Sequence, residues 1–122
     1  MIRVLIVDDH PMVTEGIKAI LETYDDIDVV GALANGQEAL DAIDSLTPDV
    51  VLMDLNMPGM NGLEFYRTLQ RQRPDLIERL AFATGDLDEE VDALIHATSR
   101  PRLFKPFQAD DLFDMIEQLS RG

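Results

Sequence analysis

Short apolar runs that each stop at a polar or charged residue are the feature that most constrains the fold of this chain. They are rich in Val, Ile, Leu and Phe and bounded by turn or helix-start signals, which is typical of buried parallel strands. The runs cover Ile2 to Val7, Val50 to Met53, Leu80 to Ala83 and Leu103 to Phe104. Ligands gather beyond the carboxyl ends of the strands in an open α/β sheet. The residues that end these runs are therefore expected to meet in one crevice.

Segments with helical spacing of apolar residues separate the strands. The predicted helices run from Pro11 to about Thr23, from a cap at Asn35 to Thr47, from Leu63 to about Arg73, from Asp88 towards Ser99, and from Gln108 to Ser120. A further strand is predicted over Asp28 to Ala34, and the last strand over Arg102 to Lys105. Right-handed crossovers then predict an α/β fold, a doubly wound five-stranded parallel sheet with five helices and the flavodoxin-like strand order 2-1-3-4-5.

Length and charge limit the domain organisation and the partners. The 122 residues, of which 46% are hydrophobic, predict one domain over residues 1–122. The formal net charge of −14 argues against direct binding of nucleic acid and favours cations or basic partners. The absence of cysteine excludes disulfides and thiolate metal sites. The first apolar stretch is too short for a signal peptide or a membrane span, so a cytoplasmic protein without membrane contact is expected.

The polar residues at the strand ends predict a metal and phosphate site. Asp8 and Asp9 follow the first strand and Asp54 follows the third, which crowds three carboxylates at a cost that demands a cation. Oxygen ligands of this kind suit Mg²⁺. Asp54 can act as a nucleophile towards a phosphoryl group whose charge the metal and Lys105 neutralise, while Thr84 donates its hydroxyl.

Each of these signals has a simpler structural explanation. Asp8 and Asp9 could cap the helix that starts near Pro11, and Asp54 could open a turn. Thr84 could begin a helix. Lys105 could be a solvated charge, although its apolar neighbours argue otherwise. The occurrence of all four signals at strand ends, in one order, favours a shared site.

The residues around these positions resemble the receiver domain of two-component response regulators, including the chemotaxis-regulator type, along nearly the whole chain. The matching strings are Val4-Leu5-Ile6-Val7-Asp8-Asp9-His10, Val50-Val51-Leu52-Met53-Asp54-Leu55-Asn56-Met57-Pro58-Gly59-Met60-Asn61-Gly62, Ala83-Thr84-Gly85 and Phe104-Lys105-Pro106-Phe107. The segment from Ser99 to Phe107 is more similar to receivers attached to hybrid histidine kinases.

The resemblance implies a role for each site residue. Asp54 would be the phosphoacceptor, taking a phosphoryl group from a phosphohistidine on a sensor histidine kinase or a histidine phosphotransfer protein. Asp9, Asp54 and the backbone carbonyl of Asn56 would ligate Mg²⁺, and Asp8 would hold a metal-bound water. Thr84 and Lys105 would grip the phosphoryl group.

The chain departs from the family at Arg102, where many receivers carry Tyr or Phe as an aromatic switch. Arg102 is interpreted as a solvent-facing strand residue, with direct sensing of the site's charge as the alternative. The two histidines, His10 and His96, are interpreted as a bystander near the site mouth and a helix-surface residue, because the donor histidine of this family belongs to the partner.

The leading functional interpretation is a phosphorylation-controlled switch of a phosphorelay, read by a downstream effector protein or domain. It is expected not to be an enzyme beyond self-catalysed phosphotransfer and autodephosphorylation at Asp54. One alternative is a Mg²⁺-dependent aspartate-nucleophile phosphohydrolase, which usually needs a second acid where this chain has Asn56. Another is a flavin carrier, although the acids at Asp8 and Asp9 would repel the flavin phosphate. Whether the receiver stands alone or begins a longer regulator, and whether phosphorylation makes it dimerise, stay open.

Overall fold

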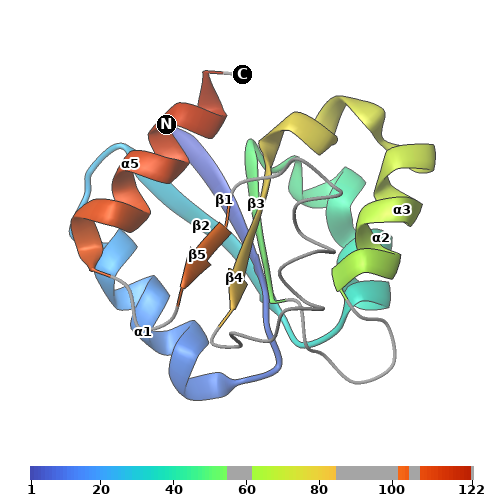
Figure 1. The fold of residues 1–122 in the computed structure, drawn as a ribbon. Coiled ribbons are helices and arrows are strands. Elements are labelled where there is room, and N and C mark those ends of the chain that lie inside the picture. The colour runs from blue at the N-terminus through green and yellow to red at the C-terminus, as the bar shows by residue number, and fades with distance from the viewer. Residues whose placement is uncertain (55–61, 85–101, 105–107, 122) are drawn as a thin grey trace.

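The computed structural model describes residues 1–54, 62–84, 102–104 and 108–121. Its centre is a five-stranded parallel sheet in the order β2-β1-β3-β4-β5 (Figure 1). The strands are β1 (Ile2–Val7), β2 (Ile27–Leu33), β3 (Val50–Asp54), β4 (Leu80–Thr84) and β5 (Arg102–Phe104). This confirms the predicted strand order and the doubly wound α/β class.

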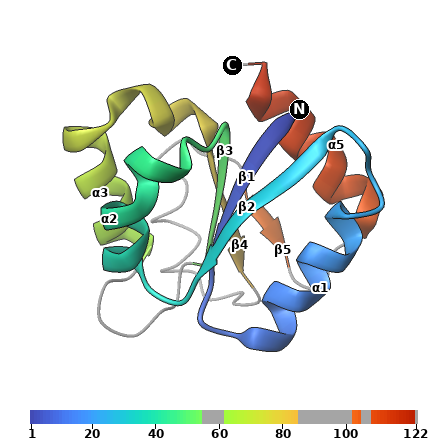
Figure 2. The same ribbon diagram turned by 180° about the vertical axis from the view of Figure 1, so that it is seen from behind.

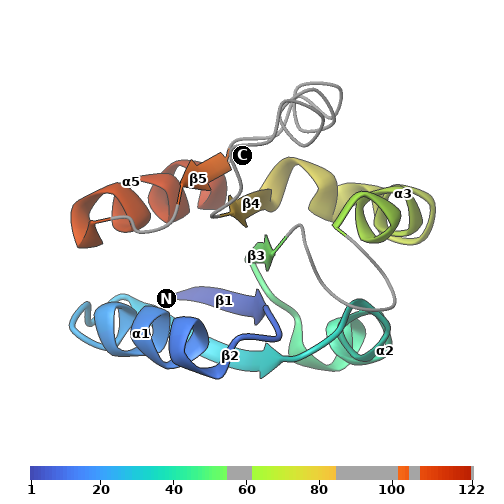
Figure 3. The ribbon, with the colours of Figure 1, turned by 60° about the horizontal axis from the view of Figure 1, so that its bottom comes forward.

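Helices cover both faces of the sheet, as the views from the front, from behind and towards its lower edge show (Figures 1, 2 and 3). One face carries α1 (Pro11–Leu21) and α5 (Ala109–Ser120), and the other carries α2 (Gly36–Leu46) and α3 (Gly62–Gln72). The helix predicted from Asp88 towards Ser99 lies outside the described residues. In the part of the chain that the structure describes, no helix is long and apolar enough to cross a membrane.

Alternating side chains of the strands fill two separate cores. Because successive residues of a strand point to opposite faces, a strand that is buried on both sides contributes to two hydrophobic layers. The layer under α2 and α3 contains Leu5, Val7, Val51, Met53 and Phe82, together with Ile43, Phe65 and Leu69 of the helices. The layer under α1 and α5 contains Val4, Ile6, Val50, Leu52 and Ala81, together with Ile17, Leu21, Leu112 and Ile116.

Two strands are one residue longer than predicted, and this matters for the site. Asp54 is the last residue of β3 and Thr84 is the last residue of β4, so their backbones belong to the sheet instead of following it. The predicted cap of α2 is confirmed, since Asn35 accepts a hydrogen bond from the Glu38 N–H at 2.8 Å. The position of the site residues is therefore tied to sheet pairing.

A short 3-10 helix, η1 (Pro74–Arg79), connects α3 to β4 and was not predicted. Pro74 does end the preceding helix, as expected from its sequence position. It also occupies the first position of η1, where its missing N–H costs nothing and its fixed φ favours a new helical turn. A proline that stops one helix can thus begin the next element.

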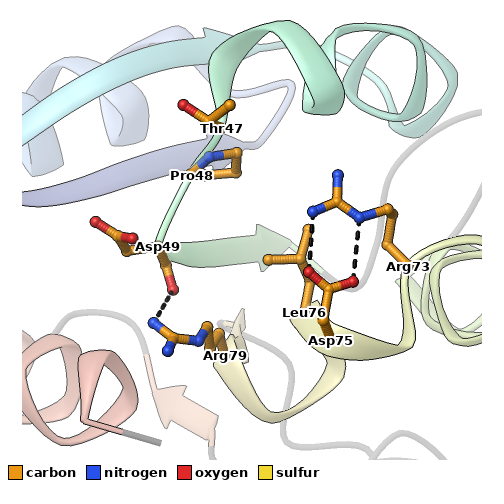
Figure 4. A pocket seen from close by; sticks show the side chains of 7 residues that line it. All are labelled: Thr47, Pro48, Asp49, Arg73, Asp75, Leu76 and Arg79. Carbon is orange, nitrogen blue, oxygen red and sulfur yellow. Dashed lines mark hydrogen bonds and ion pairs between the residues drawn. The ribbon is translucent and has the colours of Figure 1, made fainter.

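Arg73 ties α2 to η1 at the end of α3. Its guanidinium contacts Asp44 Oδ1 at 2.5 Å and binds Asp75 through two hydrogen bonds, at 2.9 and 3.1 Å (Figure 4). Hydrogen bonding from Arg73 lowers the pKa of the Asp75 carboxyl below its usual value. The same contacts, with Asp75 first and Asp44 second, raise the pKa of Arg73. The exposed setting of Asp75 keeps the energetic contribution of this pair small.

Thr47 adopts a left-handed backbone conformation, with φ 45° and ψ 58°, at the C-cap of α2. A left-handed residue commonly ends a helix, but glycine is the usual choice, because a Cβ and especially a β-branch is strained there. Within the described residues, the exposed Thr47 side chain makes no hydrogen bond that compensates for this strain. Helix α2 therefore ends at a locally unfavourable residue.

We expect Thr47→Gly to stabilise the protein by about 1 kcal/mol, because glycine removes the Cβ strain while the Thr47 carbonyl still accepts from Arg3 Nε. Thr47→Ala is the matched control, since it removes the hydroxyl and the β-branch but keeps a Cβ, and it should gain clearly less. Urea unfolding midpoints of the three proteins measure the difference. Equal midpoints for Thr47→Gly and wild type would contradict the strain at this position.

We expect Asp75→Asn to lower the urea midpoint at neutral pH by a small amount. A carboxyl whose folded-state pKa is depressed contributes stability above its unfolded pKa, and that contribution is lost as the pH falls through the folded value. The difference between wild type and Asp75→Asn should therefore shrink below about pH 4, the ordinary range of an aspartate. A difference that grows on acidification would contradict this assignment.

Candidate functional site

Strand register brings the predicted site positions to one edge of the sheet. Val7 of β1 pairs with Met53 of β3, so Asp8 and Asp54, the next residues of each chain segment, stand side by side. Asp54 pairs in turn with Ala83 of β4, and Thr84 pairs with Phe104 of β5. The carboxyl ends of β1, β3, β4 and β5 thus lie along one edge of the sheet, and Asp8, Asp54 and Thr84 stand at the first three of these ends.

Asp8 forms the turn that leads from β1 into α1. Its N–H donates to the Leu33 carbonyl at 3.0 Å, which continues the pairing of β1 with β2. Its side chain is only 3% exposed, and Oδ1 accepts from the His10 N–H at 2.9 Å, the pattern of an Asx turn. His10 is the N-cap residue of α1 and provides no side-chain cap. Asp8 therefore shapes the entry to α1 without being its N-cap. It is not the helix cap that the simpler structural explanation made of it.

Asp9 presents an oxygen whose hydrogen-bonding capacity is unused. Its side chain is 26% exposed, yet Oδ1 is buried. Among the described side chains it is the one buried nitrogen or oxygen atom without a hydrogen bond. Burying such an oxygen without a partner costs free energy, more so when it is charged. A group that binds Asp9 would remove this cost.

His10 lies against both carboxylates. Its Nδ1 is 2.8 Å from Asp8 Oδ1 and 3.1 Å from Asp9 Oδ1, while the imidazole is 56% exposed. The contact with Asp9 is an ion-pair distance without hydrogen-bond alignment. Sequence reasoning set His10 aside as a bystander and missed this contact. The one available signal was its position directly after two acids and before the proline that begins α1.

The carboxylate oxygens of this cluster suit a hard divalent cation. One oxygen or nitrogen from each of Asp8, Asp9 and His10 lies within 4.8 Å of the others. Carboxylate oxygens are ligands that Mg²⁺ prefers, and Asp9 Oδ1 has no hydrogen bond among the described residues. Asp54 ends the neighbouring strand β3, one residue beyond the pair of Val7 with Met53. The residues present therefore fit the metal that the sequence predicts at this edge.

Several predicted site residues lie outside the described residues. These are Asn56, with its backbone carbonyl, and Lys105; His96 lies there too. For Asp54, Thr84 and Arg102 the structure describes the backbone, with Arg102 opening β5 opposite Phe82. The roles given to these side chains stay predictions.

A concave region lies at the opposite edge of the sheet, where β3 and β4 begin (Figure 4). This cavity of about 390 Å³ is lined by Thr47, Pro48, Asp49, Arg73, Asp75, Leu76 and Arg79. Its arginines already hold the fold together: Arg73 pairs with carboxylates, and Arg79 donates to the carbonyls of Asp49 and Ser120 at 3.5 and 3.3 Å. The acidic edge is therefore the stronger candidate for a functional site.

Comparison with known proteins agrees with this arrangement. The family model of the response regulator receiver domain matches residues 4–117. The nitrate/nitrite response regulator protein NarL of Escherichia coli K12 is 36% identical over 121 residues, which cover 98% of this chain and 55% of NarL. The transcriptional regulatory protein LiaR of Bacillus subtilis 168 is 38% identical over 123 residues, 100% of this chain and 57% of LiaR. The chain thus spans just over half the length of these relatives.

Solved structures give the same result for the fold. The signal receiver domain of a modulated diguanylate cyclase from Desulfovibrio desulfuricans G20 superposes with a TM-score of 0.86 at 29% identity, covering 98% of this chain and 93% of that one. The response regulator domain of Thermotoga maritima CheB superposes with a TM-score of 0.85 at 26% identity, covering 100% and 98%. By its sequence, its strand order and the acidic edge of its sheet, this chain belongs to the receiver-domain family of two-component response regulators.

Proposed function

We propose that this receiver domain is a phosphoacceptor switch in which Asp54 takes a phosphoryl group in a Mg²⁺-dependent reaction. The observation that supports the proposal is the register of β1 with β3, which brings the end of β3 at Asp54 beside the end of β1, from which Asp8 and Asp9 follow. Asp9 carries the buried oxygen without a hydrogen bond. Membership of the receiver family supports the same role.

The transfer proceeds by attack of an Asp54 carboxylate oxygen on phosphorus. The phosphorus–nitrogen bond of the donor phosphohistidine breaks, its electron pair returns to the donor imidazole, and that ring takes up a proton. The reaction needs in-line positioning and compensation of the negative charge on the phosphoryl oxygens. Bound Mg²⁺ would supply that compensation, held by Asp9, Asp54 and the Asn56 carbonyl, with Asp8 binding through water.

Two further residues complete the proposed site. Thr84 ends the neighbouring strand β4, from which its hydroxyl can donate to a phosphoryl oxygen. Lys105 follows β5, whose last residue pairs with Thr84, and its ammonium offsets the remaining charge. The protein itself performs no multiple-turnover reaction in this proposal, because the only chemistry is the self-catalysed transfer to Asp54 and the later hydrolysis of its phosphate.

The proposed donor is a sensor histidine kinase or a histidine phosphotransfer protein, and the signal passes to an effector protein or an effector domain. NarL and LiaR are response regulators of nearly twice this length. Their length supports an effector that lies outside the receiver domain. The net charge of −14 makes direct contact of this chain with nucleic acid unfavourable, so any such output would be carried by another part. The cytoplasm is the proposed location.

We expect wild-type protein with Mg²⁺ and acetyl phosphate to gain about 80 Da, the mass of one phosphoryl group, and Asp54→Asn to gain nothing. Intact-protein mass spectrometry measures the adduct, and size exclusion of the same samples reports any change of oligomer. Release of inorganic phosphate over many cycles from a simple phosphate ester would favour the hydrolase alternative. A wild-type protein without an Asp54-dependent adduct would overturn the proposed function.

We expect Asp9→Asn to weaken Mg²⁺ binding at least tenfold, because it removes a charged ligand at the position of the unsatisfied oxygen. Asp25→Asn is the matched control, since Asp25 is exposed in the turn between α1 and β2 at the other edge of the sheet and changes the net charge equally. Titration calorimetry compares the two variants with wild type. Equal weakening by both variants would assign the effect to overall charge and contradict the role of Asp9.

A further inference from the structure

The imidazole of His10 is held over the acidic pair by local structure. Its own N–H donates to Asp8 Oδ1 at 2.9 Å, and Pro11 begins α1 at the next residue, so the backbone around the ring has little freedom. Nδ1 then lies 2.8 Å from Asp8 Oδ1 and 3.1 Å from Asp9 Oδ1. The His10 side chain as a whole is more than half exposed.

These separations are those of neighbouring ligands around one ion. Ligand atoms placed about 2.1 Å from a divalent metal and at right angles to each other are about 3 Å apart. The same distances also suit an Nδ1–H that donates towards the carboxylates. The position of Nδ1 is therefore compatible with two states of the ring: a donor when no ion is bound, and a third ligand when its lone pair faces the carboxylates.

The identity of the ion decides between these two states. Mg²⁺ takes oxygen ligands and keeps several waters, so an imidazole N–H that occupies the space between the carboxylates must move away before Mg²⁺ binds. Borderline ions such as Ni²⁺ and Zn²⁺ bind imidazole well and gain a ligand from the same nitrogen.

We propose that His10 sets the metal preference of the acidic pair, opposing Mg²⁺ and coordinating a borderline divalent ion through Nδ1 together with Asp8 and Asp9. The proposal deepens the proposed function, since it concerns the metal position of the same site. It assigns a role to a side chain outside the carboxylate, hydroxyl and ammonium groups that would handle the phosphoryl group.

The test compares untagged wild type with His10→Ala by titration calorimetry with Mg²⁺ and with Ni²⁺, at about pH 8, where an ordinary imidazole is neutral. We expect the dissociation constant of Mg²⁺ to fall about threefold or more, because the hydrogen bond that the metal must break is gone. The dissociation constant of Ni²⁺ should rise about tenfold or more, because a ligand is lost. The opposite signs exclude a general loss of the fold as the cause.

His96→Ala is the matched control, since His96 is the second of the two histidines in the chain, and it should leave both constants unchanged. Nitrogen-15 NMR of the imidazoles gives an independent readout, because the His96→Ala spectrum contains His10 alone. Zn²⁺ should shift the Nδ1 resonance of His10 to that of a coordinated nitrogen, whereas Mg²⁺ should leave the ring uncoordinated. Shifts of both dissociation constants in the same direction, or no shift, would overturn the proposal.

These affinities are measured without a phosphodonor, which separates the two proposals. Opposite shifts in a protein that gains no Asp54-dependent phosphoryl group would keep the role of His10 and remove the proposed function. Unchanged affinities in a protein that is phosphorylated at Asp54 would do the reverse.

Discussion

The parallel pairing of β1 with β3 is the constraint on which the rest of the site depends. Both strands are buried on both faces, so a shift of β3 by one residue would exchange its contributions to the two hydrophobic layers and turn side chains such as Met53 towards the wrong helices. The cores therefore fix the register, and the register fixes Asp8 beside Asp54. The hydrophobic effect holds like charges close together that would otherwise separate.

Crowded carboxylates store electrostatic free energy that a bound cation or phosphate chemistry can use. Asp8 is partly compensated, because its Oδ1 accepts the His10 N–H. Asp9 Oδ1 is buried and has no hydrogen bond among the described residues, although His10 Nδ1 lies 3.1 Å away. The difference is a consequence of local geometry, because the turn gives Asp8 Oδ1 a backbone N–H donor and gives Asp9 Oδ1 none. A rigid turn thus leaves one specific oxygen for an external partner.

Sequence alone predicted the strands and their order, because burial on both faces leaves unbroken apolar runs that few other structures produce. It also predicted the Asn35 cap, whose chemistry is local. It did not predict η1, because Pro74 signals an end as well as a beginning. The left-handed Thr47 was also missed, since its conformation opposes its own preference and is imposed by tertiary structure. For the site, the edge of the sheet at which Asp8, Asp54 and Thr84 lie was predictable. The contact of His10 with the two acids was not, because it depends on the geometry of one turn, which leaves no periodic signal in the sequence.

The high negative charge of the chain makes local geometry decisive for metal choice. A net charge of −14 raises the concentration of every divalent cation near the surface, and it does so with little regard to the kind of ion. Discrimination must then come from ligand type and from what has to be displaced at the acidic pair. The Nδ1 atom of His10 lies within 3.1 Å of both carboxylates. It can therefore serve as a ligand for one kind of ion and must be displaced by the other. Overall charge attracts the ion, and one neighbouring nitrogen distinguishes it.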